Sequence, residues 1–231
     1  MAVGPEGLAG LCGDLDVQTL LAAYAKGLYP RSTFGPQKWW APEERMVLFI
    51  ENFQLGSRIA RKLAGDFYRV SFDEDFDGVV EACARPSEMR GRRSWIRPDL
   101  AEVFRAAHAA GLAHSVEVRD FEGRLVGGAY GLSVGKMFFT EAQFSTQPDA
   151  GRVAFAALNC HLQSCGYIAN DAKHLNGALC QQGFSLVPRA AFNRLLEKAC
   201  ANPMAMEAWR LKDSRQIADW QPQAARLRGA A

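Results

Sequence analysis

The feature that most constrains the fold is a block of strand-like segments in the middle of the chain, enclosed by two helix patterns. Apolar stretches at 114–119, 124–132 and 136–141 are separated by short turns, as in consecutive antiparallel hairpins. A helix pattern that starts with Pro and Asp and stops at Gly occupies 98–111, and a second helix pattern occupies 151–165. This order of strands and helices predicts an α/β or α+β domain with a mixed sheet.

The N-terminal part of the chain has a different character. Residues 14–27 predict a helix that begins at an Asp cap and ends at Gly27. The stretch 28–45, rich in Pro, Gly and aromatic residues, predicts a loop or short strands. We therefore predict a small N-terminal domain over 1–48 and a larger domain over 49–231. Further strands are expected at 47–50, 67–72 and 167–171, further helices at 55–64 and 73–84, and a last helix after Pro188.

The composition is that of an ordinary globular protein with a modest charge. Hydrophobic residues make up 48% and charged residues 23% of the 231 positions, enough to bury a sizeable core. The net charge of +2 is too small to indicate nucleic-acid binding by itself. Residues 85–97 hold five arginines and one acid, and Arg58, Arg61 and Lys62 form a second basic group. Either group fits a solvated surface as well as an RNA contact.

The cysteines and the hydropathy of the chain indicate the cellular compartment of the protein. Six cysteines are scattered without a C-x-x-C pair, and no Cys/His spacing matches a tetrahedral zinc site, so we expect free thiols and no metal. The chain opens without a signal-peptide pattern, and no apolar run approaches the length of a membrane span. These features predict a cytoplasmic protein in a reducing compartment, without membrane contact.

Several segments, taken in order, carry a resemblance that runs over nearly the whole chain. They are GLAGLCGDLDVQTLLAAYAKGLYP (7–30), WWAPEERMVL (39–48), SWI (94–96), HAAGLAHSVEV (108–118), LVGGAYGLSVGKMFFTEAQFS (125–145), Asp171, and the later QGF and PRAAF. The ordered set resembles the leucyl/phenylalanyl-tRNA–protein transferases. The specificity lies in the order of the set, because no single segment is decisive.

The resemblance implies a fold and a reaction. The fold is a small N-terminal domain followed by a GNAT-like domain, an acetyltransferase-type mixed sheet. In the reaction, the α-amine of an N-terminal Arg or Lys attacks the ester that joins Leu, Phe or Met to the 3′ adenosine of tRNA. The product is a peptide bond that marks the acceptor for the N-degron pathway. The implied partners are aminoacyl-tRNA and proteins or peptides with a free N-terminus. No metal or coenzyme cofactor takes part, and we expect a monomer.

Three residues are implied as catalytic. Glu141 matches the glutamate of the family's G-E-S-M-F-S segment, and Asp171 matches the aspartate of its D-C-Q segment. Each follows an apolar strand-like stretch, so a position at a strand end facing a cleft is expected, with surface or helix-capping acids as the alternative. Lys173 stands where the family has glutamine. Because it lies two residues after Asp171, it is expected to share the same face and to pair with that carboxylate, with a side chain that swings into solvent as the alternative.

Aromatic and basic residues are assigned to the tRNA by the same resemblance. Trp95 matches a tryptophan that stacks near the terminal adenosine, with a core position as the alternative. Trp39 and Trp40 match paired aromatics of the family, with packing between the two domains as an equal alternative. Arg31 stands where the family has Trp. The tRNA backbone is expected to meet Arg58, Arg61, Lys62, Arg92 and Arg93.

The pocket for the donor side chain departs most from the family. Thr140 and Gln143 replace Gly and Met, and Asn170 replaces an aliphatic residue. Against a Leu or Phe side chain these polar groups would be unpaired, at a cost of roughly 1–3 kcal/mol each. The residues that match the pocket are Ala129, Phe138, Thr140, Gln143, Ser145, Leu158 and Asn170.

The departures leave three outcomes open. The protein keeps the family's activity with altered pocket chemistry, uses a different donor or acceptor, or binds tRNA without catalysis. The retained carboxylates favour an enzyme over a pure binding module. An acyl-CoA N-acetyltransferase is disfavoured, because the stretch 147–152 lacks the glycine pattern of a pyrophosphate loop.

Overall fold

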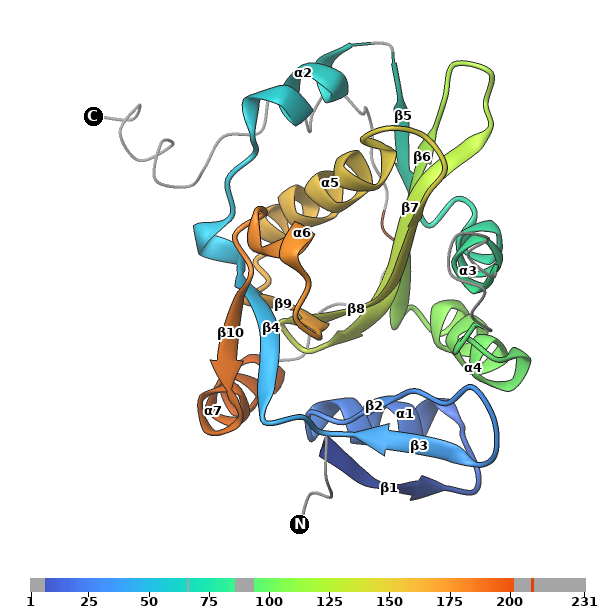
Figure 1. Ribbon diagram of the computed structural model, residues 1–231, viewed down its shortest axis with the longest axis vertical. Helices are drawn as coiled ribbons and strands as arrows, with labels where there is room; N and C mark the ends of the chain where they lie inside the picture. The colour runs from blue at the N-terminus through green and yellow to red at the C-terminus, as the bar shows by residue number, and fades with distance from the viewer. Residues whose placement is uncertain (1–6, 66, 86–93, 202–208, 210–231) are drawn as a thin grey trace.

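The chain begins with a small sheet in the computed structural model, which describes residues 7–65, 67–85, 94–201 and 209 (Figure 1). Strands β1 (Leu8–Cys12), β2 (Tyr29–Pro30) and β3 (Gln37–Trp40) pair antiparallel in the order β1-β3-β2, beside helix α1 (Val17–Ala25). Asp16 caps α1 by accepting a hydrogen bond from the Thr19 amide at 2.7 Å. Two of these strands lie in the segment that was predicted as a loop or short strands.

A seven-stranded sheet, in the order β10-β4-β9-β8-β7-β6-β5, forms the rest of the scaffold. Its centre is the antiparallel block expected from the sequence: β6 (Ala113–Arg119), β7 (Leu125–Val134) and β8 (Met137–Ser145). β5 (Arg69–Phe72) forms one edge, while β9 (Ala169–Lys173), β4 (Glu44–Phe49) and β10 (Ser185–Pro188) extend the other. β8 and β9 run parallel, whereas the other neighbours pair antiparallel. The mixed sheet confirms the predicted fold class.

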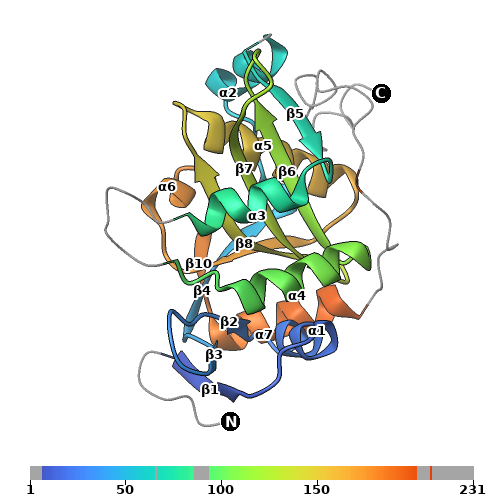
Figure 2. The same cartoon turned by 90° about the vertical axis from the view of Figure 1, so that its right-hand side faces the viewer.

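Helices cover both faces of the main sheet (Figures 1 and 2). On one face α5 (Ala150–Ser164) packs across the central strands, with α2 (Ser57–Ala64) beside it. On the other face lie α3 (Phe76–Ala84) and α4 (Pro98–Ala109), which stand in front of the sheet in Figure 2. α7 (Arg189–Cys200) packs against β4, β8 and β10. The described residues also contain two short helices, η2 (Ile50–Asn52) and α6 (Gly177–Cys180).

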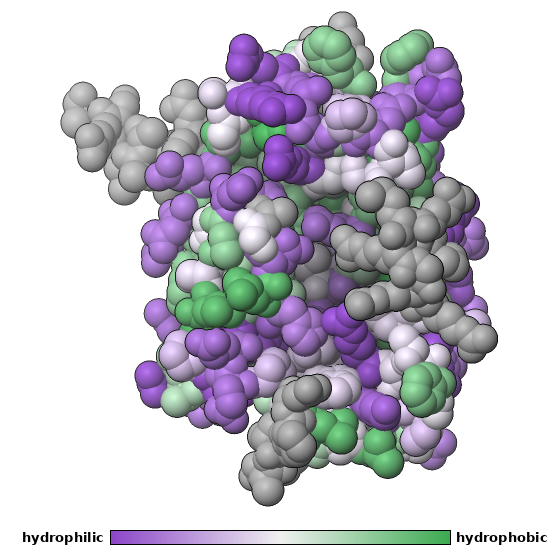
Figure 3. Space-filling model, in the orientation of Figure 1, coloured by the Kyte–Doolittle hydropathy of each residue, from purple (hydrophilic) through white to green (hydrophobic). Residues whose placement is uncertain are grey.

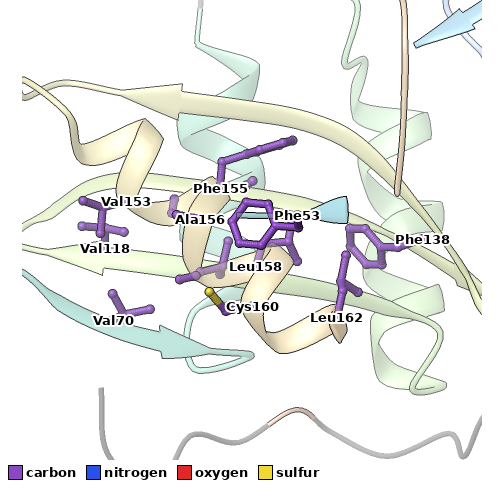
Figure 4. Close-up of a cluster of buried hydrophobic side chains, with 14 of the residues drawn as sticks. Phe53, Val70, Val118, Phe138, Val153, Phe155, Ala156, Leu158, Cys160 and Leu162 are labelled. Carbon is purple, nitrogen blue, oxygen red and sulfur yellow. The ribbon is translucent and has the colours of Figure 1, made fainter. Parts of the chain in front are cut away.

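Two buried hydrophobic clusters lie on the two faces of the main sheet. The first joins α5 to the strands, and Figure 4 shows part of it, including Phe138 and Leu158. The second joins α3, α4 and α7 to the N-terminal part, because Leu20 and Tyr24 of α1 belong to the same cluster as Phe192 of α7. The small sheet therefore has no separate core among the described residues, and its helix packs directly on the main domain.

The division between the two sheets lies earlier than residue 48. Strand β4 begins at Glu44 and belongs to the main sheet, whereas β3 ends at Trp40. We therefore propose that the N-terminal domain ends at the turn before Glu44. This short connection holds the small sheet close to the end of β9, which pairs with β4.

Candidate active site

The site forms where the parallel strands β8 and β9 diverge. Their pairing runs from Met137 opposite Ala169 to Phe139 opposite Asp171 and then ends, although β8 continues to Ser145. Beyond this point the edge of β8 no longer pairs with β9, so its backbone groups accept side chains or ligands instead. Glu141 and Lys173 both lie at this divergence.

A β-bulge places Glu141. Tyr130 of β7 faces Ala142 and Gly131 faces Thr140, so Glu141 is an extra residue in β8. A bulge of this kind reorients the side chains of the strand that carries it. Gly131 is required opposite the bulge, because a Cβ there would come within 2.3 Å of the Phe139 carbonyl oxygen. The Glu141 side chain consequently points toward the N-terminal part rather than along the regular alternation of the strand.

A second bulge places Lys173 at the end of β9. Val47 of β4 faces Asp171 and Met46 faces Lys173, which leaves Ala172 as the extra residue. Lys173 adopts a positive φ of 68°, a conformation that is uncommon for residues other than glycine. Its Nζ lies 2.5 Å from Glu141 Oε1 and 2.5 Å from the Thr140 carbonyl oxygen. The second bulge thus brings the lysine onto the free edge of β8.

Arg45 of β4 holds Asp171 in a fully buried ion pair. The guanidinium contacts both carboxylate oxygens, with Nε 3.3 Å from Oδ1 and Nη2 bonded to Oδ2. Its Nη1 donates to the Gly27 carbonyl oxygen at 2.5 Å, and its plane lies between the rings of Tyr29 and Phe192. Two-point contact with a carboxylate and stacking on aromatic rings are the arrangements that stabilise a buried arginine.

We call Arg45, Asp171, Glu141 and Lys173 the charged seam. Its members come from β4, β9 and β8, and all four are buried. The predicted pairing of Lys173 with Asp171 is wrong in its detail. The ammonium pairs with Glu141, while only the Lys173 backbone N–H, at 2.8 Å, donates to Asp171. The alternative of surface or helix-capping acids is also excluded, since both carboxylates are buried. The expected position at strand ends is wrong, because Glu141 lies within β8 and Asp171 lies within β9.

Tyr24 of α1 contacts the charged seam from the N-terminal side. Its hydroxyl donates to Glu141 Oε1, the oxygen that also receives Lys173 Nζ. Glu141 Oε2 has no hydrogen-bond partner among the described residues. Burial, followed by the charge of Glu141, raises the pKa of Tyr24 well above its usual range. One carboxylate oxygen of Glu141 is therefore fixed by two donors, and the other is buried without a partner among the described residues.

Tyr29 and His174 lie at the end of the seam. The Tyr29 hydroxyl is 2.7 Å from His174 Nε2. Burial raises the pKa of Tyr29 to about 12, and burial with the nearby cations lowers the pKa of His174 to about 4. Burial also lowers the pKa of Lys173, against the opposing charge of Glu141. The tyrosine is thus a hydrogen-bond donor at neutral pH, and the histidine is uncharged.

Sequence reasoning did not identify Arg45, Tyr24, Tyr29 or His174 as site residues. No local signal marked Arg45, because a charged residue directly before an apolar segment is an ordinary flank of a strand, and its burial is visible only in the structure. Tyr24 lies on the apolar face of its helix, where a core side chain is the ordinary expectation. No local signal connects Tyr29 with His174, 145 positions later in the chain.

The seven residues expected to form the donor pocket separate into three groups, of which Thr140 and Asn170 form the last. Ala129, Phe138 and Leu158 are buried in the α5-side cluster, where Figure 4 shows Phe138 and Leu158 among other core side chains. Gln143 and Ser145 instead line an open hollow of about 480 Å³ on the free edge of β8, together with Arg152 and Gln182. No residue of the charged seam lines this hollow, which lies further along β8 than Glu141.

The expectation that Thr140 and Asn170 carry unpaired polar groups is wrong. Thr140 Oγ1 donates to Asn170 Oδ1 at 2.8 Å, and Asn170 Nδ2 donates to Asn159 Oδ1 at 2.9 Å. Asn159 in turn donates to the Phe155 carbonyl oxygen at 2.8 Å. Asn159 on α5 supplies the partner that the spacing of β8 and β9 alone did not reveal, so the polar replacements form a connected network.

Most of the residues assigned to the tRNA 3′ end come together at the small sheet. Trp40 Nε1 donates to the Arg31 carbonyl oxygen at 2.8 Å, and the Arg31 guanidinium lies 5.8 Å from the centre of the Trp95 ring. Trp40 and Trp95 are partly exposed. Trp39 points the other way and is buried in the core, because neighbouring residues of a strand face opposite sides.

The basic group of α2 meets the start of α5. Arg58 lies 2.7 Å from Asp149 and Lys62 lies 3.5 Å from it, while Arg152 approaches the same carboxylate at 3.6 Å. We call Arg58, Arg61, Lys62 and Arg152 the basic rim. Hydrophilic residues dominate the surface around α2 in the upper part of Figure 3. Arg92 and Arg93 lie outside the described residues.

The described part of the chain contains neither a candidate metal site nor a helix that could cross a membrane. Within it, no group of His, Cys, Asp or Glu side chains is arranged to hold a metal ion. None of its helices combines the length and the apolar character needed to cross a membrane.

The mixed sheet, with its split between the parallel strands β8 and β9, has the GNAT-like fold expected from the sequence. The crystal structure of FemX shares this fold with a TM-score of 0.52 at 12% identity, covering 80% of this chain and 72% of that one. The family model for leucyl/phenylalanyl-tRNA protein transferase matches residues 47–197, and the model for that family's N-terminal domain matches 13–43. The chain belongs to this family.

Curated relatives with the same family name align with this chain over most of its length and of their own. A leucyl/phenylalanyl-tRNA–protein transferase of Syntrophotalea carbinolica is 39% identical over 87% of this chain and 88% of its own. One from Pseudomonas entomophila is 40% identical over 81% and 83%. One from Thermodesulfovibrio yellowstonii is 35% identical over 89% and 84%.

Proposed function

We propose that this protein transfers an amino acid from aminoacyl-tRNA to the N-terminal amine of an acceptor protein, and that the transfer takes place at the charged seam. The single observation that carries the proposal is the bulged, buried Glu141, whose Oε1 is held by two donors and whose Oε2 has no partner among the described residues. Membership of the family supports Leu or Phe as the donor amino acid and the N-degron pathway as the destination. We place the protein in the cytoplasm as a monomer.

The chemistry needs positioning more than activation. The aminoacyl ester already carries a good electrophile, so holding the two reactants together supplies much of the acceleration. A neutral acceptor amine attacks the ester carbonyl carbon. The new C–N bond forms, and the bond between that carbon and the ribose oxygen breaks. The proton lost by the amine passes to Glu141 Oε2 and then to the departing ribose oxygen.

The remaining members of the seam hold Glu141 in place. Tyr24 and Lys173 fix the carboxylate through Oε1, and Asp171 binds the Lys173 backbone N–H. Since Asp171 is fully buried and both of its oxygens contact Arg45, it acts as a positioning residue. The aminoacyl end enters along the hollow lined by Gln143 and Ser145.

The tRNA is held on two sides of this site. The partly exposed Trp40 and Trp95 suit stacking with the terminal adenosine, which contributes about 1–3 kcal/mol per base. The basic rim suits phosphate groups, because its cations outnumber the single carboxylate of Asp149. Arg31 lies between the two tryptophans and adds a cation beside the stacked base.

The proposal is tested by incubating the protein with a mixed pool of charged tRNAs and a library of peptides with free N-termini. Mass spectrometry should show peptides that gain one amino acid, and the melting temperature should rise with aminoacyl-tRNA but not with acetyl-CoA. A rise with acetyl-CoA, together with acetylated peptides and no aminoacylated ones, would assign the protein to a different acyltransferase reaction.

A further inference from the structure

We infer that Lys173 sets the acceptor specificity, so that the protein prefers N-termini whose first side chain is neutral or acidic over those that begin with Arg or Lys. The inference deepens the proposed function and rests on it, because it concerns the acceptor half of the same site. It starts from the charge balance of the seam.

Each carboxylate of the seam has its own cation. Arg45 contacts both oxygens of Asp171, and Lys173 Nζ lies 2.5 Å from Glu141 Oε1. Two carboxylates and two cations leave no net charge. A cationic acceptor side chain therefore finds no uncompensated carboxylate here, although a pair of acids suits such a side chain when it is left unpaired.

The surroundings of the seam add further positive charge. Arg189 Nη1 lies 3.3 Å from the Gly27 carbonyl oxygen, which also receives Arg45 Nη1 at 2.5 Å. After burial, the charge of Arg31, which lies outside the seam, is the largest of the charges that lower the pKa of His174 to about 4, whereas the charge of Asp171 opposes it. Cations thus dominate the field at the end of β9, which disfavours a second ammonium or guanidinium in a desolvated site.

The geometry fixes Lys173 in this position. Its side chain is only 5% exposed, and Nζ donates to both Glu141 and the Thr140 carbonyl oxygen. Its backbone conformation belongs to the bulge, which is anchored by the hydrogen bond from the Lys173 amide to Asp171. A surface lysine would swing into solvent when a cationic substrate arrives, whereas this one must break two hydrogen bonds to leave.

The test compares matched peptides that differ only in the first residue: Arg, Lys, Ala or Glu. Transfer from one aminoacyl-tRNA is measured as kcat and KM for the wild type, Lys173→Gln and Lys173→Arg. Lys198→Gln, an exposed lysine of α7, is the matched control.

We expect the wild type to favour Ala or Glu peptides at least tenfold. Lys173→Gln should shift that ratio at least tenfold toward Arg and Lys peptides, chiefly through KM. Lys173→Arg, which keeps the charge, and the control should retain the wild-type ratio.

Two results would overturn the inference: a wild-type preference for Arg or Lys peptides, or a ratio that Lys173→Gln leaves unchanged. Melting curves for each variant confirm that it is folded, and Lys173→Arg tests the same charge without removing it. Failure of the proposed function has a different signature, because no peptide of any kind would then be aminoacylated by the wild type.

Discussion

The charged seam and the basic rim contain the same kinds of ion in opposite surroundings. In the seam, Arg45 and Asp171 are both fully buried and in two-point contact. In the rim, the Arg58 side chain is 65% exposed although it approaches Asp149 closely. The comparison separates two uses of charge in one molecule, since burial makes an ion pair a fixed part of the fold and exposure leaves it free to exchange partners.

The difference follows from desolvation. Removing one partner of a buried pair leaves an uncompensated charge away from water, whereas an exposed partner is replaced by solvent. The seam is therefore suited to holding reacting groups in one geometry. The rim suits phosphate groups, because its cations give up their contacts with Asp149 at little cost.

The largest expected effect is on stability, when the seam loses Asp171. Asp171→Ala leaves the Arg45 guanidinium buried without its carboxylate, which should cost about 3–5 kcal/mol of unfolding free energy. For a chain of this size the melting temperature should fall by roughly 6–20 °C. Asp14→Ala, at an exposed position before α1, is the control and should change stability by less than about 0.5 kcal/mol. Equal melting curves for the two variants would show that the pair is not buried as described.

Acidification should destabilise the fold, because one neutral histidine lies at the seam and another lies in the α5-side core. Burial lowers the pKa of His161 and of His174 from about 6.5 to about 4. Between these values the unfolded chain binds more protons than the folded one. The stability is thus fully present above pH 6.5 and is lost as the pH falls toward 4.

Urea unfolding at pH 7 and pH 5 measures this loss. His161 should account for about 1–2 kcal/mol, and the more exposed His174 for less. His161→Gln should flatten the pH dependence more than His174→Gln does. A pH dependence that neither variant alters would mean that both histidines are protonated in the fold.

The smallest effect on stability is expected at the rim. Arg58→Ala with Lys62→Ala should change the unfolding free energy by at most about 1 kcal/mol, because exposed pairs contribute little. The same double variant should weaken tRNA binding and reduce the slope of log affinity against log salt by up to about 2. Arg69→Ala with Arg194→Ala removes as many exposed charges elsewhere and serves as the control. An unchanged salt slope in the rim variant would remove this surface from the tRNA interface.

The fold was largely predictable because its elements have strong local patterns. The helix at 98–111 and the strand block around 114–141 have clear caps, turns and apolar periodicity, and the structure confirms them as α4 and β6 to β8. Strand β10 was missed, since only four residues form it and its partner β4 lies more than a hundred positions earlier.

The site was predictable only where the residues match a family pattern. Glu141 and Asp171 were identified in this way, but they lie within β8 and β9 rather than at strand ends. Their partners depend on two bulges that no local pattern predicts. A bulge changes the face on which every later side chain of its strand lies, so a spacing of two residues did not decide where Lys173 points. The Thr140 and Asn170 network was missed for the same reason, because its third member lies on α5.

The central claim is that Glu141 accepts the proton of the attacking amine, and Glu141→Gln tests it most directly. The amide keeps the size of the side chain and retains an acceptor for Tyr24, while it removes the base. Single-turnover transfer from bound aminoacyl-tRNA should slow by about 10²–10⁴-fold, the usual contribution of a general base, with tRNA affinity unchanged. A transfer rate within threefold of the wild type, in a variant that binds tRNA and melts normally, would contradict the claim.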